Sequence, residues 1–132
     1  MRTARTIKHL VTKMPSRVGL LADMATTIRK AGVNLSGVLA YEMDGMGEFM
    51  FITSDDEKAA AALTSFGAEV SHEDAVSVAL PNELGALESV TRKIADAGIN
   101  INYVYGTTGT GTDTATIVFR TDDPAATVRA VG

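Results

Sequence analysis

The sequence of 132 residues contains no cysteine and no tryptophan, and it has only 3 proline residues. The absence of cysteine excludes disulfide bonds, thiolate nucleophiles and cysteine-ligated metals, and it favours a reducing compartment. Basic residues are also in deficit, since 12 Lys and Arg stand against 16 Asp and Glu. The net charge of -4 argues against a nucleic-acid surface, because binding to phosphates requires a basic face.

Long apolar segments are absent as well. No stretch approaches the roughly 18 apolar residues that a membrane-spanning helix requires. The N-terminal segment is cationic but lacks the apolar core of a signal peptide. With 45% hydrophobic residues, the chain can still bury a core. We therefore expect a globular protein of the cytoplasm that binds neither membranes nor nucleic acid.

The chain contains an internal repeat. Residues 14–40 align with residues 80–106 at a constant shift of 66 positions without gaps, and 8 of the 27 aligned positions are identical. The same shift continues to later pairs such as Asp56 and Asp122. The repeat predicts a first domain over residues 1–72 and a second over residues 73–132. The identical pairs are Pro15/Pro81, Gly19/Gly85, Leu21/Leu87, Ile28/Ile94, Ala31/Ala97, Gly32/Gly98, Asn34/Asn100 and Val38/Val104.

Each copy predicts the same order of elements. A short alternating run before the proline predicts a strand, and Ser16 and Asn82 are the predicted N-cap residues of the helix that follows. Two strands joined by a glycine-rich hairpin come next, and then a second helix. The first helix of each copy has apolar residues spaced by three and four, as one buried face requires. These residues are Leu21, Met24, Ala25 and Ile28 in the first copy, and Leu84, Leu87, Val90, Thr91 and Ile94 in the second.

A final strand over residues 68–72 completes the first copy as βαββαβ, and residues 72–74 read as a solvated linker. This α+β arrangement is ferredoxin-like, with two helices on one face of an antiparallel sheet. The equivalent strand of the second copy would fall near residues 134–138, so the second copy lacks or borrows its last strand. Because a unit of this size buries too little surface alone, we expect the copies to pack together or a homodimer to cover the unfinished edge.

The repeated loop carries a family resemblance. The segments PSRVGLL and GVNL in the first copy, and PNELGAL and GINI in the second, resemble the ACT domain. The resemblance covers nearly the whole chain as two tandem copies. It implies a regulatory fold that binds free amino acids where two ACT units meet, against the loop after the first strand. The candidate binding residues are Ser16, Arg17, Val18, Gly19, Leu20 and Asn34 in the first copy, and Asn82, Glu83, Leu84, Gly85, Ala86 and Asn100 in the second.

The chemistry of this loop suits a zwitterion. The start of a helix presents unpaired N–H groups to a carboxylate, and glycine at Gly19 and Gly85 lets another group approach the backbone. That group can be a ligand or a neighbouring copy. Asn34 and Asn100 offer both donors and an acceptor, although asparagine is also common in turns for structural reasons.

Arg17 and Glu83 occupy equivalent positions with opposite charge. The helix dipole favours glutamate and disfavours arginine at such a position. Arg17 has three alternatives, which are to pair with Glu83, to bind a ligand carboxylate, or to extend into solvent. In each case the difference predicts that the two copies are not equivalent binding sites.

Catalytic chemistry has no support in the sequence. His9 and His72 do not occupy equivalent positions, and no serine has a base partner in a nucleophile context, so we expect no metal, no cofactor and no enzymatic activity. The prediction is a regulatory protein that senses a free amino acid and acts on an enzyme of amino-acid metabolism or on its own assembly. One alternative is a ligand-independent regulatory subunit, such as the small subunit of acetohydroxyacid synthase. The other is a small enzyme.

Overall fold

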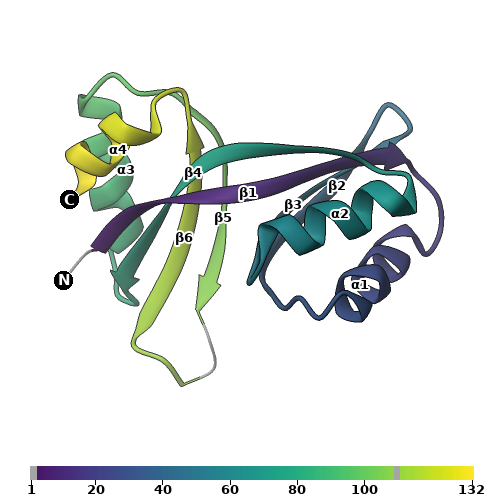
Figure 1. Cartoon of the computed structure of the whole chain (residues 1–132). Coiled ribbons are helices and arrows are strands. Elements are labelled where there is room, and N and C mark those ends of the chain that lie inside the picture. The colour runs from purple at the N-terminus through teal and green to yellow at the C-terminus, as the bar shows by residue number, and fades with distance from the viewer. Residues whose placement is uncertain (1–2, 109–110) are drawn as a thin grey trace. The chain divides into compact units, whose positions relative to one another are not determined.

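A computed structural model describes residues 3–108 and 111–132 of the chain. Within these residues strands and helices alternate as the repeat predicts (Figure 1). The elements in chain order are β1 (Thr3–Pro15), α1 (Leu20–Lys30), β2 (Leu35–Met43), β3 (Met46–Thr53), α2 (Asp56–Phe66), β4 (Glu69–Pro81), α3 (Ala86–Asp96), β5 (Ile101–Thr108), β6 (Thr114–Thr121) and α4 (Pro124–Val131).

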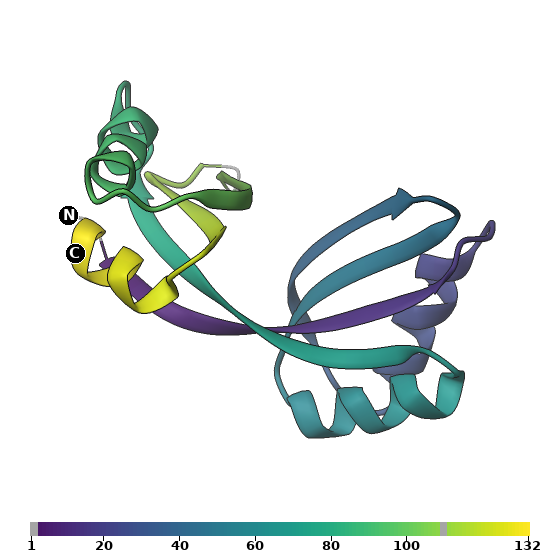
Figure 2. The same ribbon diagram turned by 90° about the horizontal axis from the view of Figure 1, so that it is seen from above.

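The chain forms two compact units. Among the described residues, the first unit is Lys8–Glu73, and the second unit comprises residues 3–7 together with the chain from Asp74 to Gly132. β1 and β4 are long strands that contribute residues to both units (Figures 1 and 2). The repeat predicts residues 3–7 in the first domain, whereas the structure groups them with the second unit.

The strands are hydrogen-bonded in the order β2-β3-β1-β4-β6-β5. The first unit therefore has the order β2-β3-β1-β4, and the second unit has the equivalent order β5-β6-β4-β1. Both are ferredoxin-like, and the helices of each unit pack on its sheet. The strand that the second copy lacks is supplied by the beginning of β1, whose Ala4 packs against the second core. The edge of β4 that was expected to be uncovered is thus paired within the same chain.

β4 is one continuous strand where two strands and a linker were expected. It includes residues 72–74, which the sequence analysis interpreted as a solvated connector. His9 is fully buried, and its Nδ1 lies 3.9 Å from Oε1 of Glu73. The interpretation as a linker is wrong because pairing with neighbouring strands determines this segment more strongly than its acidic composition does.

The core of the first unit lies between its helices and one face of its sheet. Leu10 of β1 pairs with Phe51 of β3, and both side chains are fully buried with Met24 of α1 and Leu63 of α2. Alternate residues of each strand face this core, as the period of two along a strand requires. α2 starts at a capped end, because the Asp55 carboxylate accepts a hydrogen bond from the N–H of Lys58 at 3.1 Å.

The second unit repeats this core with a changed spacing. Phe119 of β6 pairs with Val76 of β4 and is fully buried, as Phe51 is in the first unit. Phe119 lies 68 positions after Phe51, and the capping residue Asp123 of α4 lies 68 positions after Asp55. The predicted continuation of the shift of 66 to Asp56 and Asp122 is therefore wrong.

The change in spacing comes from the two hairpins. In the first unit Met43 pairs with Met46 across a two-residue turn. In the second unit Thr108 pairs with Ala115, so the connection there is longer.

Candidate functional site

The loop between β1 and α1 places a glycine immediately before the helix. Gly19 is the N-cap of α1 with φ 85°, and Gly85 is the N-cap of α3 with φ 83°. Residues with a Cβ rarely adopt this left-handed conformation, which explains why both copies carry glycine. A Cβ at either position would meet no atom within 4 Å, so the requirement is conformational and not steric.

Ser16 and Asn82 do not cap the helices, contrary to the prediction. Each lies three residues before the true N-cap, and each uses its N–H to bind the hairpin of its own unit. The Ser16 N–H donates to the carbonyl of Gly45 at 2.8 Å, and the Asn82 N–H donates to that of Asp113 at 2.8 Å. An additional turn between these residues and the helix separates them from the N–H groups they were expected to cap.

The first unit contains a cleft of about 300 Å³ beside this loop. Four of the predicted site residues line it together, and they come from the loop and the start of α1. Val18 and Asn34 lie outside the lining, and the Val18 side chain is 101% exposed. The lining residues are Ser16, Arg17, Gly19, Leu20, Leu21, Ala22, Ala40, Tyr41, Glu42, Gly47 and Phe49.

One part of the cleft is lined by apolar residues. Leu20 and Phe49 are both buried members of the first core. A Cβ at Gly47 would lie 2.9 Å from the ring of Phe49, so glycine there leaves room for the ring. Ala40 adds a small side chain from β2. This part of the cleft can therefore hold an aliphatic group.

The polar residues of the cleft carry opposite charges. Arg17 comes from the loop, and Glu42 comes from β2, where it pairs with Gly47 of β3. Both residues are exposed enough to meet a ligand. The pairing of β2 with β3 brings Glu42 and Tyr41 to the loop, and neither residue was among the predicted site residues.

Tyr41 connects the cleft to a row of polar residues across the sheet. Burial, and then the charge and hydrogen bond of Glu48, raise the pKa of Tyr41 above its usual value. Glu48 stands opposite Tyr41 on β2 and opposite Lys13 on β1. Lys13 Nζ lies 3.7 Å from Glu48 Oε1. The phenol therefore stays protonated at neutral pH and is held by Glu48.

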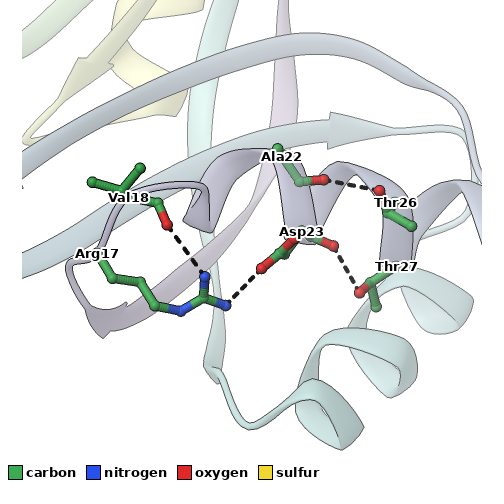
Figure 3. Close-up of polar contacts among 6 residues, drawn as sticks. All are labelled: Arg17, Val18, Ala22, Asp23, Thr26 and Thr27. Carbon is green, nitrogen blue, oxygen red and sulfur yellow. Dashed lines mark hydrogen bonds and ion pairs between the residues drawn. The ribbon is translucent and has the colours of Figure 1, made fainter.

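Arg17 binds its own helix. Its Nη2 lies 2.8 Å from Oδ2 of Asp23, and its Nη1 donates to the carbonyl of Val18 at 3.5 Å (Figure 3). Asp23 lies in the first turn of α1, where the helix dipole favours an acidic residue. Both side chains are about half exposed, so the ion pair contributes at most about 1 kcal/mol. A guanidinium has five N–H donors, which leaves Arg17 able to bind a further anion.

The two asparagines lie at the other end of the helices. The Asn34 N–H donates to Ser54 Oγ at 2.9 Å, and its carbonyl accepts from the Ser54 N–H at 2.9 Å. The carbonyl of Asn100 accepts from the N–H of Asp122 at 3.2 Å. Since α1 has 11 residues, its two ends are about 16 Å apart. Asn34 is therefore not brought to the cleft of its own unit.

The second loop has the same left-handed glycine before its helix but different side chains. The Glu83 N–H donates to the carbonyl of Pro81 at 2.9 Å, and the Ala86 N–H donates to that of Glu83 at 3.3 Å. Ala86 packs partly buried against the second core. Leu84 is 104% exposed. Glu42 and Phe49 line the cleft of the first unit, and the equivalent residues of the second unit are Thr108 and Ile117. The charge and shape of the lining are therefore not repeated.

The predicted buried face of the helices is partly wrong. Four residues were expected in the core but are exposed, namely Leu21, Ala25, Leu84 and Leu87. The buried positions of α1 are Leu20, Met24 and Ile28, and those of α3 are Val90 and Ile94. Leu84 precedes α3, and the buried row of α1 runs through Leu20 and Met24 at a spacing of four, which leaves Leu21 on the neighbouring, exposed side of the helix.

Across residues 3–108 and 111–132, no group of three or more His, Asp or Glu side chains could hold a metal ion. None of the helices in this part of the chain is sufficiently long and apolar to span a bilayer.

Comparison with known proteins identifies a matching family and similar solved structures. The model of a protein family described as ACT domain pair matches residues 5–131 of the chain. No curated protein sequence matches the chain significantly.

Solved structures share the fold over almost the whole chain. A protein of Bacteroides thetaiotaomicron is 27% identical with a TM-score of 0.87, and the match covers 96% of this chain and 87% of that one. The regulatory subunit of aspartate kinase from Thermus flavus is 15% identical with a TM-score of 0.69, covering 98% and 94%. The ligand-free regulatory subunit of aspartate kinase from Thermus thermophilus is 15% identical with a TM-score of 0.65, covering 98% and 93%. At 15% identity the two kinase subunits show a common fold.

Proposed function

Because the chain belongs to the ACT domain pair family, whose domains are regulatory modules, we propose that it is a cytoplasmic homodimer that senses a free amino acid. Occupancy of the site would be conveyed to an enzyme of amino-acid metabolism or to the assembly of the protein itself. The observation that carries the proposal is the cleft of the first unit, which combines a helix start, two opposite charges and an apolar wall. We propose this cleft as the binding site.

The cleft offers a partner for each group of a zwitterion. The N–H groups of Leu21 and Ala22 lie in the first turn of α1, where they have no partner within the helix, and they favour a carboxylate together with Arg17. The Glu42 carboxylate suits the ammonium group. Leu20 and Phe49 then face the side chain of the ligand. This distribution favours an amino acid with an aliphatic side chain over a charged one.

A thermal-shift screen of the twenty amino acids at millimolar concentration tests the proposal. Binding to the folded state stabilises a protein by RT ln(1 + [L]/Kd), which is about 2.7 kcal/mol when the ligand is at 100 times its Kd. We expect the aliphatic amino acids to raise the melting temperature. If none of the twenty changes it, the alternative of a ligand-independent regulatory subunit replaces this proposal.

Two matched glycine variants separate binding from folding. Gly19→Leu and Gly85→Leu both place a side chain on a left-handed residue with no atom near its Cβ, so the two should lose similar stability. Only Gly19→Leu puts that side chain beside the cleft. We expect it to abolish the thermal shift, while Gly85→Leu keeps it. Loss of the shift in both variants would show that the effect comes from the fold and not from the cleft.

Charge-neutral variants identify the two polar contacts. Arg17→Gln and Glu42→Gln each remove one charge from the cleft at an exposed position, and we expect each to weaken binding by at least about tenfold, since a charge-assisted hydrogen bond contributes about 1.5–3 kcal/mol. Isothermal titration with the amino acid found in the screen measures the change. Unchanged affinity in both variants would place the ligand elsewhere.

A further inference from the structure

Exposed apolar side chains recur at the same positions in both units. Val18 and Leu84 are equivalent, and both are completely exposed, at 101% and 104%. Leu21 and Leu87, three positions later, are also equivalent and exposed. Single exposed apolar residues are ordinary on a protein surface, but the recurrence of a pair in both units indicates a common cause. Leu21 lines the cleft, but neither Val18 nor Leu84 does, so amino-acid binding does not explain these two residues.

The two apolar pairs differ in the charge beside them. Arg17 precedes Val18, and Glu83 precedes Leu84. The first turn of α3 adds Glu88 to the acidic side. Contact between two first-unit loops would bring two arginines together, and contact between two second-unit loops would bring glutamates together. A first-unit loop against a second-unit loop is the combination that pairs opposite charges.

We propose that the loop at residues 17–19 of one copy docks on the loop at residues 83–85 of a second copy. In this contact Val18 packs against Leu84 and Leu87, and Arg17 pairs with Glu83. Arg17 keeps its bond to Asp23, because its remaining N–H donors reach the incoming carboxylate. This inference rests on the homodimer of the proposed function and names its surface, and the contact needs no amino acid.

The glycines make such docking geometrically possible. With φ 85° at Gly19 and φ 83° at Gly85, each chain turns sharply at the helix start, and a Cβ at either position would face open space. The side chain just before each glycine therefore projects away from its own unit, as Val18 does in Figure 3. Two apolar side chains presented in this way can pack with little reorganisation of either loop.

Charge reversal tests the contact. Arg17→Glu and Glu83→Arg are compared with the wild type and with the double variant in which both changes are made, using sedimentation equilibrium without added amino acid. Each single variant should associate at least tenfold more weakly, because both of its loops then carry the same charge. The double variant, and an equal mixture of the two single variants, should associate about as strongly as the wild type, since opposite charges are restored.

The control is Arg29→Glu, which reverses an exposed charge at the far end of α1 and should associate like the wild type. A wild-type protein that stays monomeric at about 1 mM overturns the inference. It is equally overturned if the mixture and the double variant remain as weak as the single variants, or if both single variants associate like the wild type, as contact between like loops would give, because like charges then face each other before and after the change. Far-UV circular dichroism of each variant confirms that it is folded.

The apolar half of the contact has its own variants. Leu84→Asp places a charge where an apolar partner is expected and should weaken association at least tenfold, whereas Leu84→Met should not. Equal association of the two variants overturns the packing of Val18 on Leu84. Association is measured without amino acid, so a silent ligand screen would end the proposed sensing function and leave this result standing.

Discussion

Replacement of Thr127 by valine should destabilise the second unit more than the same replacement of Thr121, although the two hydroxyl groups bind each other. Their Oγ1 atoms are 2.7 Å apart, and both residues are fully buried. The Thr127 hydroxyl also lies 2.8 Å from the carbonyl of Asp123, to which it donates. A hydroxyl has a single proton, so Thr127 accepts from Thr121 and Thr121 is the donor of the pair.

Which hydroxyl donates determines how much each substitution lowers the free energy of unfolding. Thr127→Val removes the acceptor of Thr121 and leaves a buried donor unsatisfied, which costs about 1–3 kcal/mol in addition to the lost bonds. Thr121→Val leaves Thr127 bound to Asp123 and costs about 0.5–1.5 kcal/mol. In the double variant no hydroxyl of the pair remains. Its destabilisation should therefore fall below the sum of the single variants by about 1 kcal/mol or more.

Urea unfolding followed by far-UV circular dichroism measures these differences through the midpoint at a constant slope. The reasoning is refuted if Thr121→Val is at least as destabilising as Thr127→Val, or if the two effects simply add. The first unit provides the control, because Ala59 stands at the position of Thr127 and Thr53 donates instead to Asp56. Thr53→Val should lower stability without depending on residue 59.

Two further predictions concern the caps and the alkaline limit of stability. Asp55→Ala and Asp123→Ala each remove a carboxylate that accepts a hydrogen bond from an N–H at the start of a helix. Each should lower the free energy of unfolding, measured by urea titration, by about 1 kcal/mol. Asparagine also caps helices, so an Asn variant as unstable as the Ala variant would contradict the capping role. Burial raises the pKa of Tyr105 to about 12, so above pH 10 the unfolded chain ionises first and stability falls as pH rises through 12. The urea midpoint should therefore fall more between about pH 9 and pH 11 in the wild type than in Tyr105→Phe. An equal fall in both proteins would assign the loss of stability at high pH to other groups.

The sequence determines most of the fold because its repeat is marked by residues with strong backbone preferences. Proline before the loop, glycine at both helix ends and apolar residues at helical spacing predict the order of elements in each copy. The strand shared between the units could not be predicted in the same way. Whether Thr3–Pro15 ends in one unit or continues into the other depends on which strands it pairs with, and pairing is a long-range property that local patterns do not contain.

The candidate site was predictable only where it is continuous in sequence. Ser16, Arg17 and Gly19 reach the cleft together because they belong to one short loop. Glu42 reaches it through the register of β2 and β3, in which it stands opposite Gly47. The Asp-Gly turn at residues 44–45 is the signal that could have identified it, since a two-residue hairpin fixes this register.

The two loops separate what the backbone requires from what the side chains do. Gly19 and Gly85 adopt almost the same positive φ, and neither is forced to be glycine by a neighbouring atom, so both copies keep the turn itself. The residues around the turn are not kept, since Arg17 corresponds to Glu83. A structural turn alone would need the glycine but no particular charge. Opposite charges at equivalent positions are expected if the two loops bind each other in the homodimer. The charge-reversal variants distinguish this explanation from divergence of the two copies without a function for the charges.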